Sequence, residues 1–202
     1  AILAARRNKK IIERPEFEES IERVIAGPER KSRLINPREK RIIAYHEAGH
    51  AVVINALPEG DPVQKVSIIS RGMMGGFTRA LPTEDLSLES RKKLFANMVS
   101  MLGGRAAEEI MFDDITSGAS SDIERVTKLA RSMVTRLGMS EKLGPMVYGQ
   151  KEEMVFLGRE ISEQRDYSEA VAQEIDREVQ SAVSEAYKTA KEILEKYKDK
   201  LI

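Results

Sequence analysis

The sequence predicts a mainly α-helical protein with one small β-sheet or hairpin. Apolar residues recur at spacings of three and four through most of its 202 residues, which is the periodicity of amphipathic helices. Residues that cap or end helices, such as Asn36 and Gly138, stand at the ends of these periodic segments. Alternating apolar residues are confined to residues 64–70 and 77–81, and the glycines between these two stretches indicate a turn or loop.

The N-terminal part of the chain is predicted to hold three helices. Two short helices are expected over residues 1–26, the second ending at Gly27-Pro28, and a polar connector follows. A third helix begins at the Asn36 cap and ends before Pro58. Its apolar side is broad, so we expect this helix to be buried, with its polar side chains facing an interior or a cleft.

The rest of the chain, beyond the two possible strands, is also predicted to be helical. The expected segments are a helix capped by Ser87 that runs to Ile110 with a soft break at Gly103-Gly104, a helix from near Asp122 to a stop at Gly138, a loop region over residues 139–166, and one long amphipathic helix or two in series from Tyr167 to the end.

The composition excludes several classes of protein. Hydrophobic residues make up 41% of the chain and charged residues 33%, with a formal net charge of zero, which is typical of a soluble globular protein without a general attraction to nucleic acid. With no cysteine, disulfides and cysteine-based zinc sites are excluded. Neither a membrane span nor a signal peptide is visible. Because the chain lacks an initiator methionine and begins in what looks like mid-helix, we expect it to be an excised fragment.

The most informative motif contains the only two histidines of the chain. His46 and His50 are four residues apart, so on a helix both imidazoles lie on one face and can reach one metal ion. Glu47 stands beside the first histidine, where a carboxylate can act on a water without binding the metal. This is the HExxH arrangement of zinc metallopeptidases. The alternative is a surface helix with two solvated histidines and a glutamate.

A third metal ligand must be a carboxylate. Catalytic zinc usually takes three protein ligands and keeps one position for water, and no further histidine exists. The acidic candidates are Glu108 and Glu109, in the helix after the two glycines, and Asp122, after a Gly/Ser-rich loop. An aspartate in the first turn of a helix can also simply complement the helix dipole. Spacing alone does not decide between Asp122 and Glu108.

An ordered set of stretches through most of the chain resembles the peptidase domain of the FtsH family, the ATP-dependent, membrane-anchored zinc proteases known as AAA proteases. HExxH is shared by many families, but the ordered set is specific. The stretches are residues 3–8 (LAARRN), 21–32 (IERVIAGPERKS), 44–52 (AYHEAGHAV), 102–109 (LGGRAAEE), 116–123 (TSGASSDI) and 137–140 (LGMS).

This resemblance implies roles for individual residues. The aspartate of the SGAxxD stretch is the family's third zinc ligand, which maps onto Asp122 beside His46 and His50. Glu47 is then the general base that takes the proton of the attacking water. The resemblance leaves Glu108 near the site, holding a ligand or the active-site helix.

The resemblance also implies a domain division and partners. Residues 1–30 are expected to be the C-terminal helical remnant of an AAA ATPase module, and residues 31–202 a helical zinc metalloprotease domain. ATP and Mg are expected only in the absent ATPase module, and a membrane anchor is absent as well. The full-length protein is expected at the cytoplasmic face of the bacterial inner membrane, or in an organelle membrane. It would be a homo-oligomer, a hexamer, that degrades unfolded, short-lived or membrane proteins and binds no nucleic acid.

One departure concerns the loop before the second strand. In the family a leucine is common where this chain has Gly75, in a segment thought to present an edge strand to substrate. An extra glycine there is expected to loosen the grip on substrate and to leave the chemistry unchanged.

Two hypotheses from other functional classes compete with the hypothesis that the chain is a peptidase. One is a helical interaction domain with a structural metal, in which the protein would fill all four positions around zinc. The other is a pseudoprotease that acts as a chaperone-like ring, against which the intact set His46, Glu47, His50 and Asp122 argues.

Overall fold

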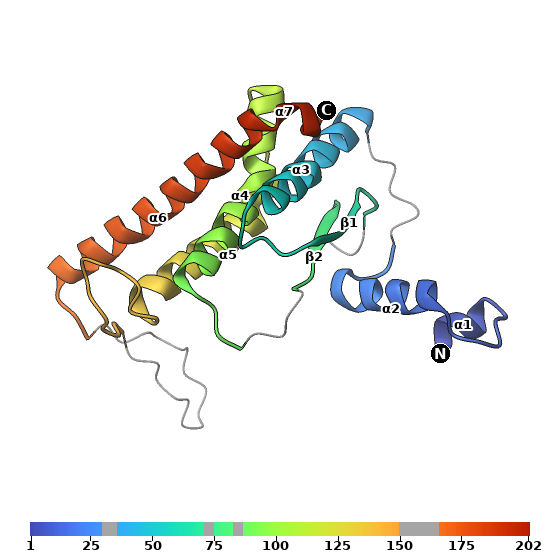
Figure 1. Cartoon of the computed structure of the whole chain (residues 1–202), viewed down its shortest axis with the longest axis horizontal. Coiled ribbons are helices and arrows are strands. Elements are labelled where there is room, and N and C mark those ends of the chain that lie inside the picture. The colour runs from blue at the N-terminus through green and yellow to red at the C-terminus, as the bar shows by residue number, and fades with distance from the viewer. Residues whose placement is uncertain (30–35, 71–74, 83–86, 150–165) are drawn as a thin grey trace.

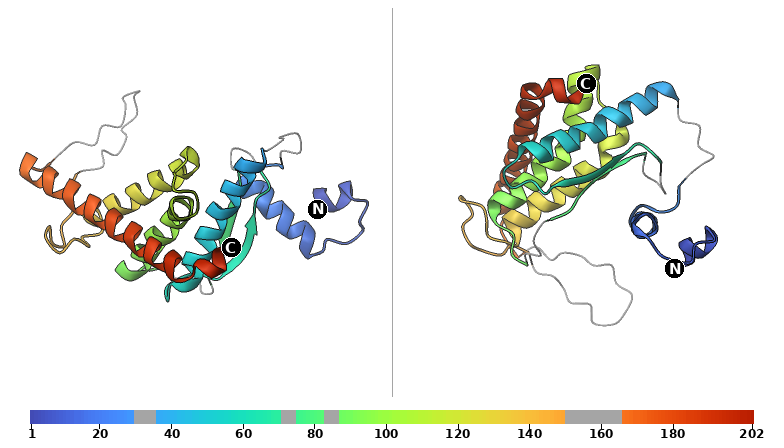
Figure 2. Two further views of the ribbon diagram at one scale, coloured as in Figure 1. Left: turned by 90° about the horizontal axis from the view of Figure 1, so that it is seen from above. Right: turned by 45° about the vertical axis from the view of Figure 1, so that its right-hand side comes forward.

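The computed structural model describes residues 1–29, 36–70, 75–82, 87–149 and 166–202. Within these ranges the chain is mainly α-helical and has one two-stranded antiparallel sheet, which confirms the predicted fold class. The long helices form a bundle, the hairpin lies along one side of it, and the two N-terminal helices lie beyond the hairpin (Figure 1). Figure 2 shows the helical bundle, the hairpin and the two N-terminal helices from two other directions.

The centre of the bundle is α4 (Arg91–Phe112), which packs against three other helices. These are α3 (Pro37–Ala56), α5 (Ser120–Thr135) and α6 (Glu169–Lys196), and the one-turn α7 (Lys198–Leu201) follows α6. Because α4 has neighbours on several sides, it is apolar on several sides, as the core of the bundle requires. Its buried apolar residues are Leu94, Ala96, Met98, Val99, Leu102, Ala106 and Ala107.

Small residues let α3 and α4 cross at close range. A Cβ atom placed on Gly49 would lie 2.5 Å from both the Cβ of Ala107 and the carbonyl oxygen of Gly103. A Cβ atom on Gly103 would lie 2.9 Å from the carbonyl oxygen of Gly49. Close packing of the two helices is therefore the reason for a glycine between the two histidines.

The hairpin consists of β1 (Val63–Ser67) and β2 (Phe77–Ala80). The strands pair antiparallel with Val66 opposite Thr78, and the register shifts between Val63 and Lys65. Both strands pack against α3, which places β2 beside the helix that carries the histidines. The predicted hairpin is confirmed, with a first strand that ends three residues earlier than expected.

Polar contacts hold the two N-terminal helices, α1 (Ile2–Arg6) and α2 (Arg14–Ala26), to each other. Glu16 is 1% exposed and forms ion pairs with Arg7 at 3.0 Å and Lys9 at 2.9 Å. Lys65 on β1 pairs with Glu22 on α2. Several large apolar side chains of this segment face solvent in the described chain, namely Ile2, Ile11, Ile12, Phe17, Ile21 and Val24. The two predicted short helices are confirmed, and α2 ends at Gly27 as expected.

Two predictions about α4 were wrong. The helix begins at Arg91 because Ser90, and not Ser87, accepts a hydrogen bond from the backbone N–H of Lys93. The helix is also continuous through Gly103-Gly104, where packing against α3 replaces the expected break.

The remaining boundaries agree closely with expectation. The Asn36 cap accepts a hydrogen bond from the backbone N–H of Arg38, and α3 ends at Ala56. Gly138 follows α5 with a φ of +60°, and the C-terminal segment is two helices in series. Of the predicted loop region 139–166, residues 150–165 lie outside the described part. No helix among the described residues combines the length and the apolar character that a membrane crossing needs.

Candidate metal centre

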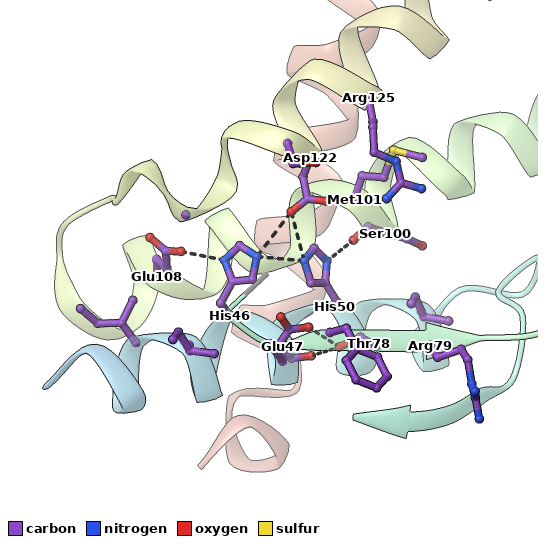
Figure 3. A pocket seen from close by; sticks show the side chains of 18 of the residues that line it. His46, Glu47, His50, Thr78, Arg79, Ser100, Met101, Glu108, Asp122 and Arg125 are labelled. Carbon is purple, nitrogen blue, oxygen red and sulfur yellow. Dashed lines mark hydrogen bonds and ion pairs between the residues drawn. The ribbon is translucent and has the colours of Figure 1, made fainter. Parts of the chain in front are cut away.

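Three side chains from two helices converge on one point. His46 and His50 come from adjacent turns of α3, and Asp122 comes from the first turn of α5. The two Nε2 atoms lie 3.1 Å apart, and Oδ2 of Asp122 lies 3.4 Å from that of His46 and 3.5 Å from that of His50. Figure 3 shows the two rings and the carboxylate pointing at one another. These three residues are the one group in the described chain whose donor atoms could hold a metal ion.

The other nitrogen of each histidine has its own acceptor. Nδ1 of His50 lies 2.8 Å from the carbonyl oxygen of Ser100, and Nδ1 of His46 lies 2.7 Å from Oε1 of Glu108. A carbonyl oxygen can only accept, and the Glu108 carboxylate accepts as well, so both Nδ1 atoms carry the proton. Two Nε2 lone pairs and a carboxylate oxygen then face one another, which requires a cation between them.

Without a metal, a proton can take the place of that cation, and the pKa values of His46 and Asp122 describe this state. Burial opposes a charge on His46, but its hydrogen bonds with Asp122 and Glu108 prevail and raise its pKa to about 9. Burial likewise opposes the charge of Asp122, and hydrogen bonds with His46 and His50 hold its pKa well below the usual range. A divalent metal ion would satisfy the same lone pairs in place of the proton, so the donor set fits a metal such as zinc.

Glu108 occupies a different place from Asp122. Its buried carboxylate accepts from Nδ1 of His46 with one oxygen and from the backbone N–H of Thr116 with the other, at 2.7 Å each. Burial raises its pKa, but these hydrogen bonds outweigh burial and lower it. Thr116 begins the turn that leads through the short 3-10 helix η1 (Ser117–Ala119) into α5. Glu108 therefore links the His46 ring to the segment that presents Asp122.

Of the three carboxylates that the sequence offered, the structure places only Asp122 beside both Nε2 atoms. Glu108 lies on the opposite side of the His46 ring, at Nδ1. Glu109 points toward α6, where it accepts from Lys191 at 2.8 Å and from the hydroxyl of Tyr187.

A glycine on α4 gives the His46 ring its place. A Cβ atom on Gly104 would lie 2.5 Å from Nε2 and 2.6 Å from Cε1 of His46. The ring therefore lies directly against the backbone of α4, and any side chain at this position would displace it. This contact was not predicted from the sequence, in which Gly103-Gly104 indicated a break in the helix.

Glu47 lies beside the convergent groups and contacts the hairpin. Its side chain is 6% exposed, and Oε2 accepts from the hydroxyl of Thr78 at 2.7 Å (Figure 3). Burial raises the pKa of the Glu47 carboxyl above its ordinary value, although the Thr78 hydrogen bond and the two histidines act in the opposite direction. The side chain is thus held close to the site and has a strengthened affinity for a proton.

The site opens into a cleft with a volume of about 1220 Å³. Its walls are α3, β2, the middle of α4 and the segment that leads into α5. Three contacts that build this site were not found from the sequence. They are the Thr78 hydroxyl on Glu47, the Ser100 carbonyl on His50 and the Thr116 N–H on Glu108. Only Thr116 had a signal, since it begins the stretch 116–123 that contains Asp122.

Comparisons with known proteins agree with this geometry. The model of peptidase family M41 matches residues 33–202. The chain is 59% identical over 201 residues to ATP-dependent zinc metalloprotease FtsH 1 of Thermomicrobium roseum, covering 100% of this chain and 31% of that protein. It is 57% identical over 202 residues to FtsH of Kosmotoga olearia and 56% identical over 202 residues to FtsH of Thermotoga maritima. Both matches cover 100% of this chain, with 31% of the Kosmotoga and 33% of the Thermotoga protein.

The chain thus spans about a third of the length of these curated relatives. The family match covers the helices that supply the two histidines, Glu47, Glu108 and Asp122, and it also covers the hairpin beside them. The chain belongs to peptidase family M41, as a member with the peptidase domain of the FtsH proteases.

Proposed function

We propose that this chain is the zinc-dependent endopeptidase unit of an ATP-dependent protease. One observation carries the proposal, namely that three metal-ligating atoms converge beside a buried glutamate at the wall of an open cleft. The names of the relatives, ATP-dependent zinc metalloproteases, support it.

The residues that would hold zinc are His46 and His50 through Nε2 and Asp122 through its carboxylate. Three protein ligands are the usual number in a catalytic zinc site, because the fourth position takes water or substrate. Bound zinc supplies Lewis acidity, which lowers the pKa of a water and polarises the carbonyl of the scissile peptide. Glu108 and the carbonyl of Ser100 fix the tautomer and the orientation of the two rings.

Glu47 is the proposed general base. Its carboxylate takes the proton of the attacking water and returns it to the nitrogen of the leaving amine. Burial supports this role because it raises the pKa of the carboxyl toward the working pH, where a base transfers protons most effectively. Residues of β2 line the neighbouring cleft, and substrate that adds to the edge of this strand would be held mainly through its main chain.

The full-length protein is proposed to be larger than this chain. Residues 1–30 are the last helices of an ATPase module, which would bind ATP and Mg, and residues 31–202 are the protease domain. The start of the family match at residue 33 supports this boundary. The full-length protein would be a membrane-anchored hexamer at the cytoplasmic face of a bacterial inner membrane, degrading unfolded, short-lived and membrane proteins.

The test is hydrolysis of casein and of an unstructured peptide, with and without a zinc chelator. Hydrolysis should stop when zinc is removed and resume when it is restored. Glu47→Gln should keep zinc and lose activity by about 10² to 10⁴-fold, the usual contribution of a general base. Full activity in this variant would contradict the assignment of the base.

Zinc content tests the ligands separately. Asp122→Ala should lose the metal, whereas Glu108→Ala should weaken zinc affinity by about 10- to 100-fold, as loss of a group behind a ligand does. The opposite order would assign the third ligand to Glu108. Zinc that stays bound in a chain that hydrolyses nothing would favour a structural metal.

A further inference from the structure

We propose that Thr78 is a positioning residue that fixes Glu47 for proton transfer. The inference rests on the proposed role of Glu47 as general base. It assigns to the hairpin a part in the chemistry, in addition to forming a wall of the cleft.

The Thr78 hydroxyl lies between two acceptors of the same residue. Oγ1 is 2.7 Å from Oε2 of Glu47 and 2.9 Å from its main-chain carbonyl oxygen. A hydroxyl has one proton to donate, and a charged carboxylate is the stronger acceptor. The hydrogen bond to Oε2 therefore ties the end of a long, flexible side chain to a point on the strand.

Among the described residues, Thr78 is the one hydrogen-bond donor to the Glu47 carboxylate. Its bond uses Oε2 and leaves Oε1 to accept the proton of a water. On that side lies Gly76, where a Cβ atom would be 2.9 Å from both Cγ and Oε1 of Glu47. The glycine keeps room for the carboxylate beside Oε1, and Thr78 decides which oxygen faces that room.

The strand itself is held in place. Thr78 pairs with Val66 across the hairpin, and both strands pack on α3, the helix that carries Glu47. A glutamate without such a contact samples several rotamers and loses that freedom each time it reacts. An anchored carboxylate is already in its reactive position, and a displacement of about 1 Å can cost 100-fold in rate.

The kinetic test replaces the hydroxyl while conserving shape. Thr78→Val should lower kcat for an unstructured peptide by about 10- to 100-fold, with KM changed less than about twofold and zinc content unchanged. Thr78→Ser keeps the hydroxyl and should keep kcat within about threefold of the parent. The matched control is Val66→Thr, the reverse exchange at the residue opposite, which should leave kcat and KM unchanged.

A merely structural role for Thr78 would give a different pattern. Thr78→Ser and Thr78→Val would then lose activity together, or the loss would appear in KM or in zinc content. Either result, or a Thr78→Val variant with the parent kcat, would overturn the proposal.

Combination with Glu47→Gln separates this inference from the proposed function. If Thr78 acts through Glu47, adding Thr78→Val to Glu47→Gln should give no further loss in kcat. A further loss of 10-fold or more would show that Thr78 acts independently of the base. If Glu47→Gln alone keeps full activity, the base assignment fails whatever Thr78 does.

A measurement on the zinc-free chain needs no turnover. Thr78→Val leaves a buried carboxylate without its donor, so the urea midpoint of unfolding should fall. The fall should be smaller in the Glu47→Gln background, where the buried group is uncharged. Equal falls in the two backgrounds would show that Thr78 and Glu47 are not coupled.

Discussion

The α3–α4 crossing and the outer layer of the molecule, which comprises α1, α2 and the hairpin, are built on opposite principles. At the crossing Gly49, Gly103 and Ala107 meet so closely that one added methyl group has no room. The outer layer is joined by ion pairs and hydrogen bonds, and its helices expose large apolar side chains such as Phe17 and Val24.

This difference shows where the geometry of the site is determined. The two histidines lie at the crossing, and contacts with the α4 backbone at Gly104 and Ser100 fix their rings. Glu47, the proposed base, lies at the boundary, where the outer layer contacts it through Thr78. Ligand geometry should therefore depend on close packing, and the outer layer should affect catalysis without much effect on the core.

The largest effect is expected from Gly49→Ala. The new methyl group would overlap Ala107 and the backbone of Gly103, so α3 and α4 must separate. We expect a loss of about 2 to 4 kcal/mol in the free energy of unfolding, despite the better helix propensity of alanine. Urea unfolding measures the loss. The control is Gly75→Ala in the outer layer, where the added Cβ would meet only the end of the Ile43 side chain, at 3.1 Å. Equal effects at both positions would remove the distinction.

Metal removal should make the stability of the crossing depend on pH. In the zinc-free chain the pKa of His46 is raised to about 9 from an ordinary value of 6.5. The stabilisation that its proton provides is complete below pH 6.5 and is lost as the pH rises through about 9. The loss should reach up to about 3 kcal/mol.

Urea midpoints measured in chelator from pH 6 to pH 9.5 test this dependence. His46→Gln is the control, since it has no proton to lose in that range. A decline of the same size in this variant would assign the pH dependence to other groups.

A smaller effect is expected from salt, and only in the outer layer. At 1 M salt the screening length is about 3 Å, so the attraction between the charges of the α1–α2 ion pairs weakens where the pairs are exposed. Trypsin should then cut at Arg6, Arg7, Lys9 and Lys10 about two- to fivefold faster than at low salt. Cleavage within α4, at the centre of the bundle, should remain slower than cleavage at these sites. Earlier cleavage within α4 would reverse the comparison.

The smallest change in stability is expected from Gly75→Leu. The new side chain would meet only the flexible end of the Ile43 side chain, which can move aside. Replacing glycine also reduces the freedom of the unfolded chain, so the free energy of unfolding should change by less than about 1 kcal/mol. A stiffer approach to β2 should lower KM for an unstructured peptide and leave kcat unchanged. A kcat change without a KM change would show that this loop acts on the chemistry and not on the grip.

The sequence predicted the features that depend on local patterns. Helix periodicity located the long helices of the described residues, and the spacing of His46 and His50 placed the two side chains on one face. The sequence did not predict what depends on a partner far along the chain. Gly103-Gly104 looks like a break until α3 packs against it, and Thr78 is an ordinary strand residue until the hairpin reaches Glu47. Likewise Ser87 and Ser90 are equivalent caps until one of them accepts the hydrogen bond.

The position of Asp122 has a consequence for the history of each molecule. The two histidines lie on adjacent turns of α3, whereas Asp122 is 72 residues after His50, on α5, and α4 packs against both of these helices. A chain that is still being synthesised offers the metal two nitrogen atoms, and the complete donor set exists only in the folded form. Metal binding thus stabilises the folded state by mass action. The newly made chain can therefore hold the metal with all three residues only when it is no longer an unfolded polypeptide itself.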